Sequence, residues 1–331
     1  MKNNHRFRNF DTKNFLRRYG TVLGALAIFI VFSVLADNFL TATNFFMLLR
    51  QMSMLTIISL GFTFVMSAGG FDMSIGNVTG LVNITFAIVL IGTGSFLIAL
   101  LAALALGIGV GVVNGALVAY LGLPDFIGTF AIGSVAFGIK MMITKGNPIF
   151  FDDDVPRIFE FIGQGYVGPV PFPVILMFFF VGVVIFILIK TKLGRRIYAI
   201  GGNYTASLFA GINVKGYRFL TFIFSGISVA IASVILTSRL GSAQPLAGEA
   251  FLLDTIAVVF LSATMFGEGE PTGQGTFVGA LIISMLTNGL TMLNVPYYFQ
   301  YITKGLVVIV AVSLSVVLGQ KFRVKFKIRP E

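Results

Sequence analysis

The sequence predicts an all-α polytopic membrane protein with about ten transmembrane helices. Hydrophobic residues make up 56% of the 331 residues, glycine contributes 38 more, and only 11% of the chain is charged. The mean hydropathy is +0.95. A soluble fold has too little interior to bury so much apolar surface, which excludes a soluble enzyme and a disordered chain. The apolar residues form long continuous runs, whereas a membrane β-barrel would show short alternating strands.

Ten apolar runs are long enough to cross a membrane, since a helical span needs about 20 apolar residues. The first run is too long for the apolar part of a signal peptide, and no small-residue cleavage site follows it, so we treat it as a span. Together the runs predict a transmembrane domain over residues 20–318, between tails at 1–19 and 319–331. The runs cover residues 20–36, 48–68, 74–92, 95–121, 126–144, 171–190, 217–237, 251–267, 274–293 and 299–318.

The distribution of positive charge predicts the orientation of these spans. The formal net charge is +10, and 17 of the 23 Lys and Arg residues lie before the first run, around the loop 191–216 or after the last run. Lys and Arg mark cytoplasmic loops, and ten crossings place all three patches on one side. Both tails are therefore predicted to be cytoplasmic, and the acidic loop 145–170 to lie outside. Basic tails beside spans set orientation, so we expect no nucleic acid partner.

Two Asn-Gly pairs, each followed by a proline, indicate an inverted repeat. Asn114-Gly115 ends the fourth run. Asn288-Gly289 ends the ninth run. The fourth run is predicted to cross inward and the ninth outward, and related segments with opposite directions are typical of transporters. Two such pairs also arise by chance, so coincidence is the alternative.

The sequence carries no pattern typical of an enzyme. It has no cysteine and a single histidine, His5, and it contains no P-loop, HExxH or GxSxG motif. We therefore predict no catalytic residue, no metal ligand and no cofactor bound by this chain. An intramembrane aspartate pair of Asp72 and Asp254 is disfavoured, because both residues lie near the ends of their runs.

An ion-coupled secondary transporter is the alternative function, and a channel or receptor-like scaffold is a third. Ion coupling needs ionisable groups within the membrane. Lys140 and Lys304 lie close enough to the ends of their runs to extend their amines to the membrane surface. Asp254 is placed to cap the start of a helix. Without a deep acidic residue, the sequence gives little support to proton coupling.

A short helix is predicted within the loop 191–216. Asn203 is a good N-cap, residues 204–210 form two turns, and Gly211 suits the position after the helix. A helix of this length needs packing against the protein or a partner. Its apolar surface comes from Ile200, Leu208, Phe209 and Ile212. It either lies on the membrane face or docks a cytoplasmic partner.

Five motifs occur together in an order and spacing that identify a family. They are residues 69–76 (GGFDMSIG), Asn114-Gly115 with Leu123-Pro124, residues 199–203 (AIGGN) with Gly211-Ile212, residues 238–245 (SRLGSAQP), and Asn288-Gly289 with residues 304–306. Over residues 45–315 the chain resembles permease subunits of bacterial ATP-binding-cassette importers for monosaccharides, of the ribose/xylose/galactose and autoinducer-2 type. This resemblance implies a type II importer fold in the bacterial inner membrane.

The resemblance also implies partners. Two permease subunits, identical or homologous, would form the pathway, two cytoplasmic subunits would bind and use ATP, and an extracytoplasmic binding protein would deliver the solute. The family's segment that couples to the ATP-binding subunits matches Gly201, Gly202, Asn203, Ala206, Gly211 and Ile212. The chain departs from the family at Tyr204 and Thr205, where acidic residues are common, and at Pro124-Asp125, where two prolines are usual.

Two further groups of residues are candidates for the transport mechanism. Gly69 and Gly70 permit a sharp turn, and Asp72 and Ser74 are placed either to cap the next helix or to form a moving gate. A sugar pathway needs weak hydrogen-bonding groups, for which the candidates are Asn83, Asn114, Ser242, Gln244 and Asn288. Each of these five also suits a plain role in interhelical hydrogen bonding.

Overall fold

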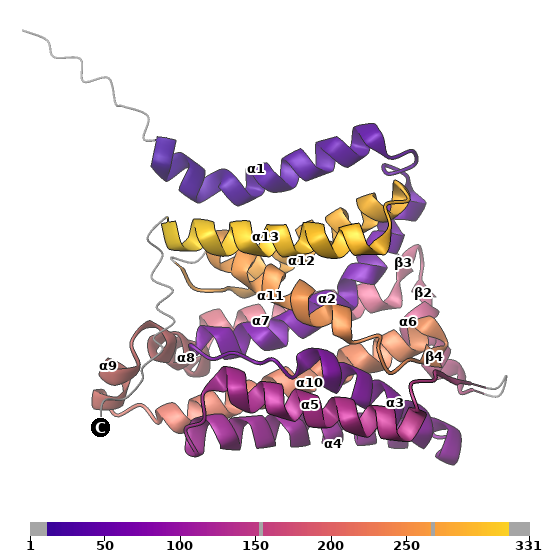
Figure 1. Cartoon of the computed structure of the whole chain (residues 1–331), viewed down its shortest axis with the longest axis horizontal. Coiled ribbons are helices and arrows are strands. Elements are labelled where there is room, and N and C mark those ends of the chain that lie inside the picture. The colour runs from indigo at the N-terminus through magenta and orange to yellow at the C-terminus, as the bar shows by residue number, and fades with distance from the viewer. Residues whose placement is uncertain (1–11, 152–154, 266–268, 318–331) are drawn as a thin grey trace, which may run out of the picture.

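The computed structural model describes residues 12–151, 155–265 and 269–317, and these form a bundle of long helices. Figure 1 shows the long helices side by side in a bundle, with short elements at both ends. Ten helices in the described ranges have 17 residues or more: α1 (Thr12–Leu35), α2 (Ala42–Ser67), α3 (Ile75–Thr93), α4 (Phe96–Gly115), α5 (Asp125–Thr144), α7 (Phe172–Lys190), α10 (Val214–Leu240), α11 (Glu249–Met265), α12 (Gly273–Met292) and α13 (Tyr297–Val317).

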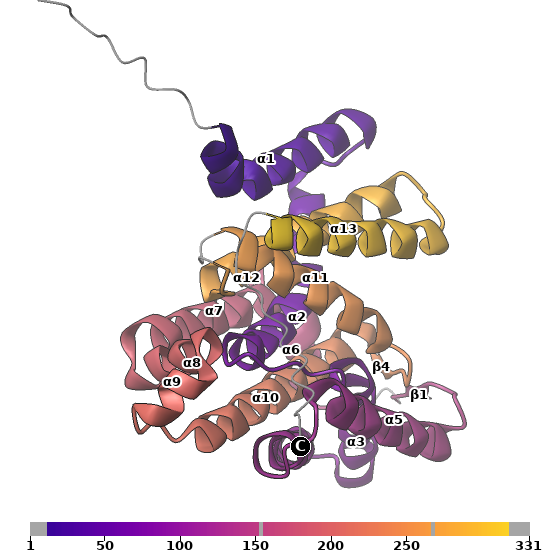
Figure 2. The same ribbon diagram turned by 60° about the vertical axis from the view of Figure 1, so that its left-hand side comes forward.

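Seven of the described helices are long and apolar enough to cross a membrane: α2, α3, α4 with its extension, α5, α7, α10 and α12. Helices α1, α11 and α13 lie alongside them in Figures 1 and 2. In α1, the apolar part covers Leu23–Leu35. Each of the ten predicted runs thus coincides with a long helix. The two predicted basic tails lie largely outside the described residues.

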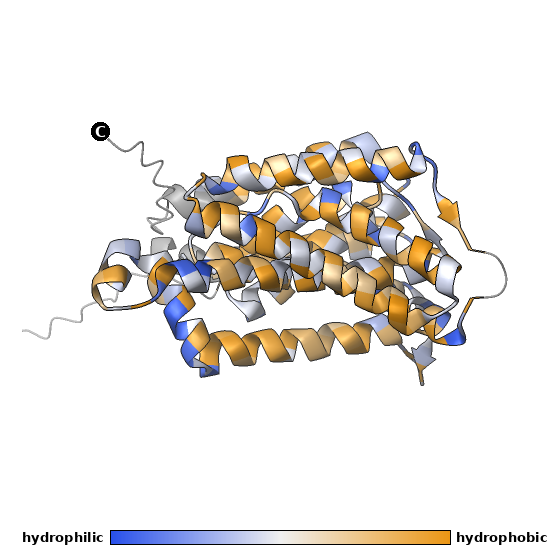
Figure 3. Ribbon diagram, turned by 90° about the horizontal axis from the view of Figure 1, so that it is seen from below, coloured by the Kyte–Doolittle hydropathy of each residue, from blue (hydrophilic) through white to orange (hydrophobic). Residues whose placement is uncertain are grey.

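The core of the bundle is built around α2, α3 and α10. In each of these three helices 67% of the residues in the apolar window are buried, against 22% in α4 with its extension and 28% in α5 and α7. Met52, Ile57 and Phe62 on α2 are fully buried. Figure 3 shows orange, hydrophobic residues along the lengths of the helices and blue residues mainly towards their ends. This distribution suits a lipid-facing bundle.

The two ends of the bundle carry different short elements. One end, called the α9 end below, holds α8 (Lys192–Gly202) and α9 (Tyr204–Phe209). The opposite end, called the α6 end, holds α6 (Arg157–Gln164) and two antiparallel strand pairs. Strand β1 (Ile149–Phe150) pairs with β4 (Ser242–Ala243), and β2 (Tyr166–Val167) pairs with β3 (Val170–Pro171).

Helix α4 continues into a π-helical turn, η1 (Ala116–Tyr120), before the chain reverses into α5. The reversal uses Gly122, whose φ of 75° is readily adopted only by glycine. Pro124 then precedes the first residue of α5. A π-helical turn widens the end of a helix and is frequent at functional sites.

Two non-helical segments enter the bundle from opposite ends. The α2–α3 turn (residues 68–74) starts at the α9 end and follows α5, because Phe71 contacts Asp125 and Met73 contacts Thr129. Ser74 then lies beside Gly133, where an added Cβ would be 3.2 Å from the Ser74 Cα. Asp125 and Gly133 are eight residues apart on α5, which corresponds to about 12 Å along the helix. The α2–α3 turn covers this length, so α3 begins well inside the bundle.

The α10–α11 turn (residues 241–248) enters from the α6 end. Its Pro245 and Gly248 pack against the first turns of α3, where Gly80 faces the Pro245 carbonyl and Gly248 faces the Gly76 carbonyl. An added Cβ on Gly248 would also lie 2.8 Å from the Thr79 Cβ. Non-helical backbone at membrane depth is tolerated where protein buries it, and both turns meet this condition around the start of α3.

Candidate coupling and gating site

Helix α9 projects from its end of the bundle as an exposed, capped helix. The Asn203 side-chain oxygen accepts a hydrogen bond from the Ala206 amide at 3.0 Å. Gly211 has a φ of +76° and follows the helix. The predicted short helix and both of its end signals are therefore confirmed. Phe209 is 85% exposed and Leu208 is 54% exposed, so α9 presents an apolar surface.

Helix α8 anchors this exposed helix to the bundle. Ile200 is 2% exposed and Ile197 is fully buried, so Ile200 belongs to the core rather than to the apolar surface predicted for the loop. The reason is that the loop forms two helices rather than one. Ile200 lies on the inner face of the first, amphipathic helix, α8, and so does not share the exposed surface of α9. Ile212 is half-buried, while Gly202 and Ala206 are exposed.

Helix α8 lies directly against the end of α2. A Cβ on Gly201 would collide with the Ser67 carbonyl, and a Cβ on Gly69 would lie 3.7 Å from the Gly201 Cα. The Tyr198 hydroxyl donates a hydrogen bond to the Pro271 carbonyl at 3.0 Å. Burial raises the pKa of Tyr198 to about 12, so the hydroxyl stays a protonated donor. Helix α8 therefore packs against the start of the α2–α3 turn.

The α2–α3 turn holds a buried carboxylate. Gly69 has a φ of +73°, which allows the sharp turn predicted from the Gly-Gly pair. Asp72 accepts hydrogen bonds from the Ser74 amide at 2.9 Å, the Ser74 hydroxyl at 2.6 Å and the Ser225 hydroxyl at 2.9 Å.

The capping prediction is half right. Asp72 does bind a free backbone amide at the start of α3, but the Ser74 side chain caps no amide. Ser74 has helical backbone angles rather than the extended angles of a usual N-cap residue. Its hydroxyl instead donates to Asp72 and accepts a hydrogen bond from the Asn114 amide group at 2.9 Å. Ser74 therefore links α4 to the buried carboxylate.

An ion pair holds the same turn from a second side. The Arg218 guanidinium lies 2.7 Å from the Asp125 carboxylate, and the same carboxylate accepts a hydrogen bond from the Phe71 amide at 3.1 Å. Sequence reasoning did not select this pair. The available signals were weak, namely a departure from the family's proline pair at Asp125 and one arginine within a basic patch at Arg218.

The five predicted pathway residues lie in separate places. Asn114 joins the Asp72 turn, whereas Asn288 and Asn44 exchange side-chain hydrogen bonds of 2.9 and 3.1 Å between α12 and α2. Ser242 lies in β4, with Gln244 hydrogen-bonded to it at 3.4 Å. Asn83 is fully buried on α3, and both of its side-chain polar atoms are without a hydrogen-bond partner among the described residues. Their role in a pathway stays a prediction.

Two buried lysines correct the prediction that their amines reach the membrane surface. Lys304 lies 2.8 Å from Asp254, and Lys140 lies 3.0 Å from Asn77 and 3.6 Å from Glu249. Asp254 lies within α11 rather than at its start, so the capping prediction for it is wrong. A lysine can avoid the free-energy cost of burying its amine by extending to the membrane surface. Here each amine is buried instead, and its pairing with a carboxylate lowers that cost. Among the described residues, no three His, Asp or Glu side chains cluster as a metal site would require.

Comparison with known proteins places the chain among transport permeases. Residues 44–312 match the family model described as the permease component of the branched-chain amino acid transport system. The ribose import permease protein of Haemophilus influenzae is 37% identical over 316 residues, which are 95% of this chain and 97% of that protein. The ribose import permease protein of Bacillus subtilis is 37% identical over 91% of this chain and 93% of its own length.

A third relative is named for a different sugar. The D-allose transport system permease protein of Escherichia coli is 33% identical over 309 residues, covering 92% of this chain and 94% of that protein. No solved structure matches the chain. The match to the family model covers most of the chain, including both turns and α8 to α10. The chain therefore belongs to the family of membrane permease components that includes the ribose and D-allose permeases.

Proposed function

We propose that this chain is the membrane-spanning permease subunit of an ATP-binding-cassette importer that moves a monosaccharide or a similar small polar solute into the cytoplasm. The similarity to ribose and D-allose permeases supports the solute class. The observation that carries the mechanism is the contact of α8 with the α2–α3 turn, together with the exposed α9 that directly follows α8. An exposed apolar helix joined to a buried polar turn is suited to convert partner movement into a change inside the membrane.

The proposed assembly needs further chains. Two ATP-binding subunits dock on α9 of two permease subunits, which are two copies of this chain or this chain with a homologue. An extracytoplasmic binding protein docks at the α6 end. The partner subunits use ATP, and this chain itself binds no cofactor. The adjacent exposed apolar residues Leu208 and Phe209 support the first contact, because contiguous exposed apolar surface marks an interaction site.

We infer ten crossings, with both tails in the cytoplasm of a bacterium and the chain in its inner membrane. Three observations support this topology. Helices α1, α11 and α13 run beside the seven apolar helices, α8 carries basic residues, and the two turns enter the bundle from opposite ends. The units α2–turn–α3 and α10–turn–α11 also have the relation expected of an inverted repeat.

The proposed transport step begins at α9. Binding of ATP by the partners moves α9 and α8, and α8 moves Gly69 because Gly201 lies against it. The movement is opposed by the Arg218–Asp125 ion pair and by the hydrogen bonds to Asp72. Opening these contacts would alter the position of α3, which carries Asn83 and lies beside Asn114 of α4, and both side chains offer groups for solute hydroxyls. The coupling residues Gly201, Gly202, Asn203, Ala206, Gly211 and Ile212 remain a proposal in this scheme.

Copurification tests the proposal. The tagged chain is purified in mild detergent from cells that express its operon neighbours, and the accompanying proteins are identified. We expect an ATP-binding subunit that is lost with Phe209→Asp and with Gly202→Arg. Phe150→Asp is the matched control, because Phe150 is 69% exposed at the α6 end.

A chain that is purified alone and transports solute in vesicles under an ion gradient would contradict the proposal. It would establish the secondary transporter instead. Equal loss of the ATP-binding subunit with Phe150→Asp would contradict docking on α9 specifically, because that substitution lies at the opposite end of the bundle.

A further inference from the structure

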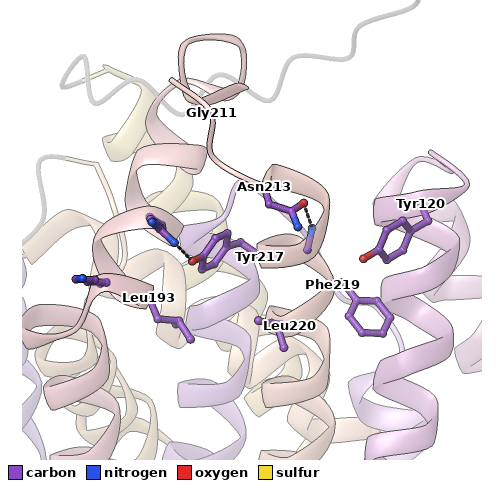
Figure 4. Close-up of a pocket in the computed structure, with 10 residues that line it drawn as sticks. Tyr120, Leu193, Gly211, Asn213, Tyr217, Phe219 and Leu220 are labelled. Carbon is purple, nitrogen blue, oxygen red and sulfur yellow. Dashed lines mark hydrogen bonds between the residues drawn. The ribbon is translucent and has the colours of Figure 1, made fainter. Parts of the chain in front are cut away.

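A groove of about 720 Å³ lies between α8, η1 and the start of α10. Figure 4 shows Leu193 on one side, Tyr120 and Phe219 on the other, and Tyr217 and Leu220 between them. The groove also touches the residues that follow α9, at Gly211 and Asn213. None of the contacts that link α8 to the α2–α3 turn uses this groove, so the proposed mechanism leaves it unexplained.

The groove carries positive charge that no carboxylate pairs with among the described residues. Lys192 and Arg196 line it, and none of the described lining residues is acidic. In the described part of the chain, neither side chain takes part in an ion pair. The Arg196 guanidinium donates a hydrogen bond to the Tyr217 hydroxyl and lies 5.4 Å from the centroid of the Tyr217 ring. These contacts fix the guanidinium at the groove wall, where it can bind an anion.

The rest of the lining is apolar and aromatic. Tyr120, at the end of η1, is 53% exposed and packs edge-on against Phe219 with ring centroids 5.5 Å apart. Leu193 and Leu220 complete this surface. A site with cations on one part and leucine and aromatic side chains on another suits a molecule with an anionic head and an apolar body.

The position of the groove agrees with such a ligand. It lies at the ends of α10 and of α4 with η1, and only 22% of the residues in the α4 span are buried, so this side of the bundle faces lipid. In the proposed topology this is the cytoplasmic leaflet. Anionic lipids of this leaflet attract basic residues, and basic pockets beside transmembrane helices bind their headgroups.

We propose that this groove binds the headgroup of an anionic phospholipid. Lys192 and Arg196 contact the phosphate, and the acyl chains lie along Leu193, Leu220 and Phe219. The groove includes α8 before α9 and Asn213 after α9, so a bound lipid would hold the base of the proposed coupling helix on both sides. Regulation of coupling rests on the proposed function, whereas binding of the lipid does not.

Tryptophan fluorescence provides a direct test, because the chain contains no tryptophan. The variant Tyr120→Trp places one fluorophore at the groove and is reconstituted into vesicles of phosphatidylcholine with brominated phosphatidylglycerol or brominated phosphatidylcholine. We expect the brominated anionic lipid to bind on the order of tenfold more tightly, from two cations near the surface. Lys192→Gln/Arg196→Gln should abolish this preference.

A matched control separates the groove from general surface charge. Lys190→Gln/Arg195→Gln removes two cations from the same region that do not line the groove, and this variant should keep the preference. Equal quenching by the two brominated lipids, or equal loss of preference in both double variants, would overturn the proposal.

Two further arms identify other occupants. Displacement of the brominated lipid by millimolar glycerol phosphate would show that the site takes a soluble phosphate ester instead. Displacement by the purified ATP-binding subunit, with loss of its copurification in Lys192→Gln/Arg196→Gln, would show a protein docking surface. Either result would overturn the lipid assignment. Failure of the proposed importer function would leave the quenching result intact, so the two failures are distinguishable.

Discussion

The two turns that enter the bundle are held in different ways. Side chains hold the α2–α3 turn: Asp125 and Thr129 accept hydrogen bonds from its backbone amides, and Asp72 bonds Ser225. Backbone contacts hold the α10–α11 turn, through the β4–β1 pairing and the close approach of Gly248 to Gly76. Hydrogen bonds can exchange partners when a helix moves, whereas close-packed backbone cannot deform gradually. We therefore propose that the turn beside α8 is the one that moves.

The largest expected effect comes from adding a single methyl group to the fixed turn. In Gly248→Ala the new Cβ meets the Gly76 carbonyl and lies 2.9 Å from the Gly80 backbone nitrogen, so the turn must shift. We expect a loss of about 3 kcal/mol in stability, as for severe overpacking. The measurement is the melting temperature in detergent, with Gly92→Ala as control because nothing lies within 4 Å of that position. Equal melting of both variants would show that the α10–α11 turn is loosely packed.

A smaller effect is expected from the ion pair on the α2–α3 turn. Asp125→Asn leaves the Arg218 charge without its carboxylate, and the side chains are 19% and 17% exposed. We expect a cost of about 2 kcal/mol, between the values for exposed and buried pairs. A double-mutant cycle with Arg218→Gln measures the coupling between the two side chains. The melting temperature and the transport rate are compared for both single variants and the double variant. Additive effects of the two substitutions would indicate that the pair does not hold the turn.

The smallest effect is expected from neutralising the buried carboxylate. Asp72→Asn keeps an oxygen that can accept from Ser74, and the Ser225 hydroxyl can turn to accept from the new amide group. If Asp72 only caps α3, the substitution should lower the free energy of unfolding by about 1 kcal/mol at most and leave the transport rate unchanged. Solute uptake in reconstituted vesicles is the measurement, and Asp72→Ala is the comparison variant. A strong loss of uptake with normal melting would assign a role to the charge itself.

Local patterns were sufficient for much of this protein. Apolar runs predicted each long helix, because a span is defined by the hydropathy of consecutive residues. Cap residues predicted α9, since Asn203 and Gly211 act on amides and backbone angles within a few positions. The family was also evident from motif order, and the family model confirmed it.

The failures concern residues whose partners are distant in the chain. Arg218 and Asp125 are 93 positions apart, and Lys304 and Asp254 are 50 apart. Without knowledge of these partners, extension of a lysine to the membrane surface is the lower-cost expectation. Asn288 is not a failure, because its hydrogen bonds to Asn44 agree with the interhelical role considered for it, but that partner lies 244 positions away and local sequence could not identify it.

By itself, the sequence determined where the helices lie, which ends carry basic charge and which short helix projects from the bundle. These properties follow from consecutive residues and their transfer between water and lipid. Only the tertiary structure decided that the α2–α3 turn reaches into the bundle, that Ser74 joins Asp72 to Asn114, and that two lysines are buried with carboxylates. Those features depend on which helices pack together. A polar group buried inside the bundle needs a partner to offset the free-energy cost of its burial, and that partner comes from a helix distant in the sequence.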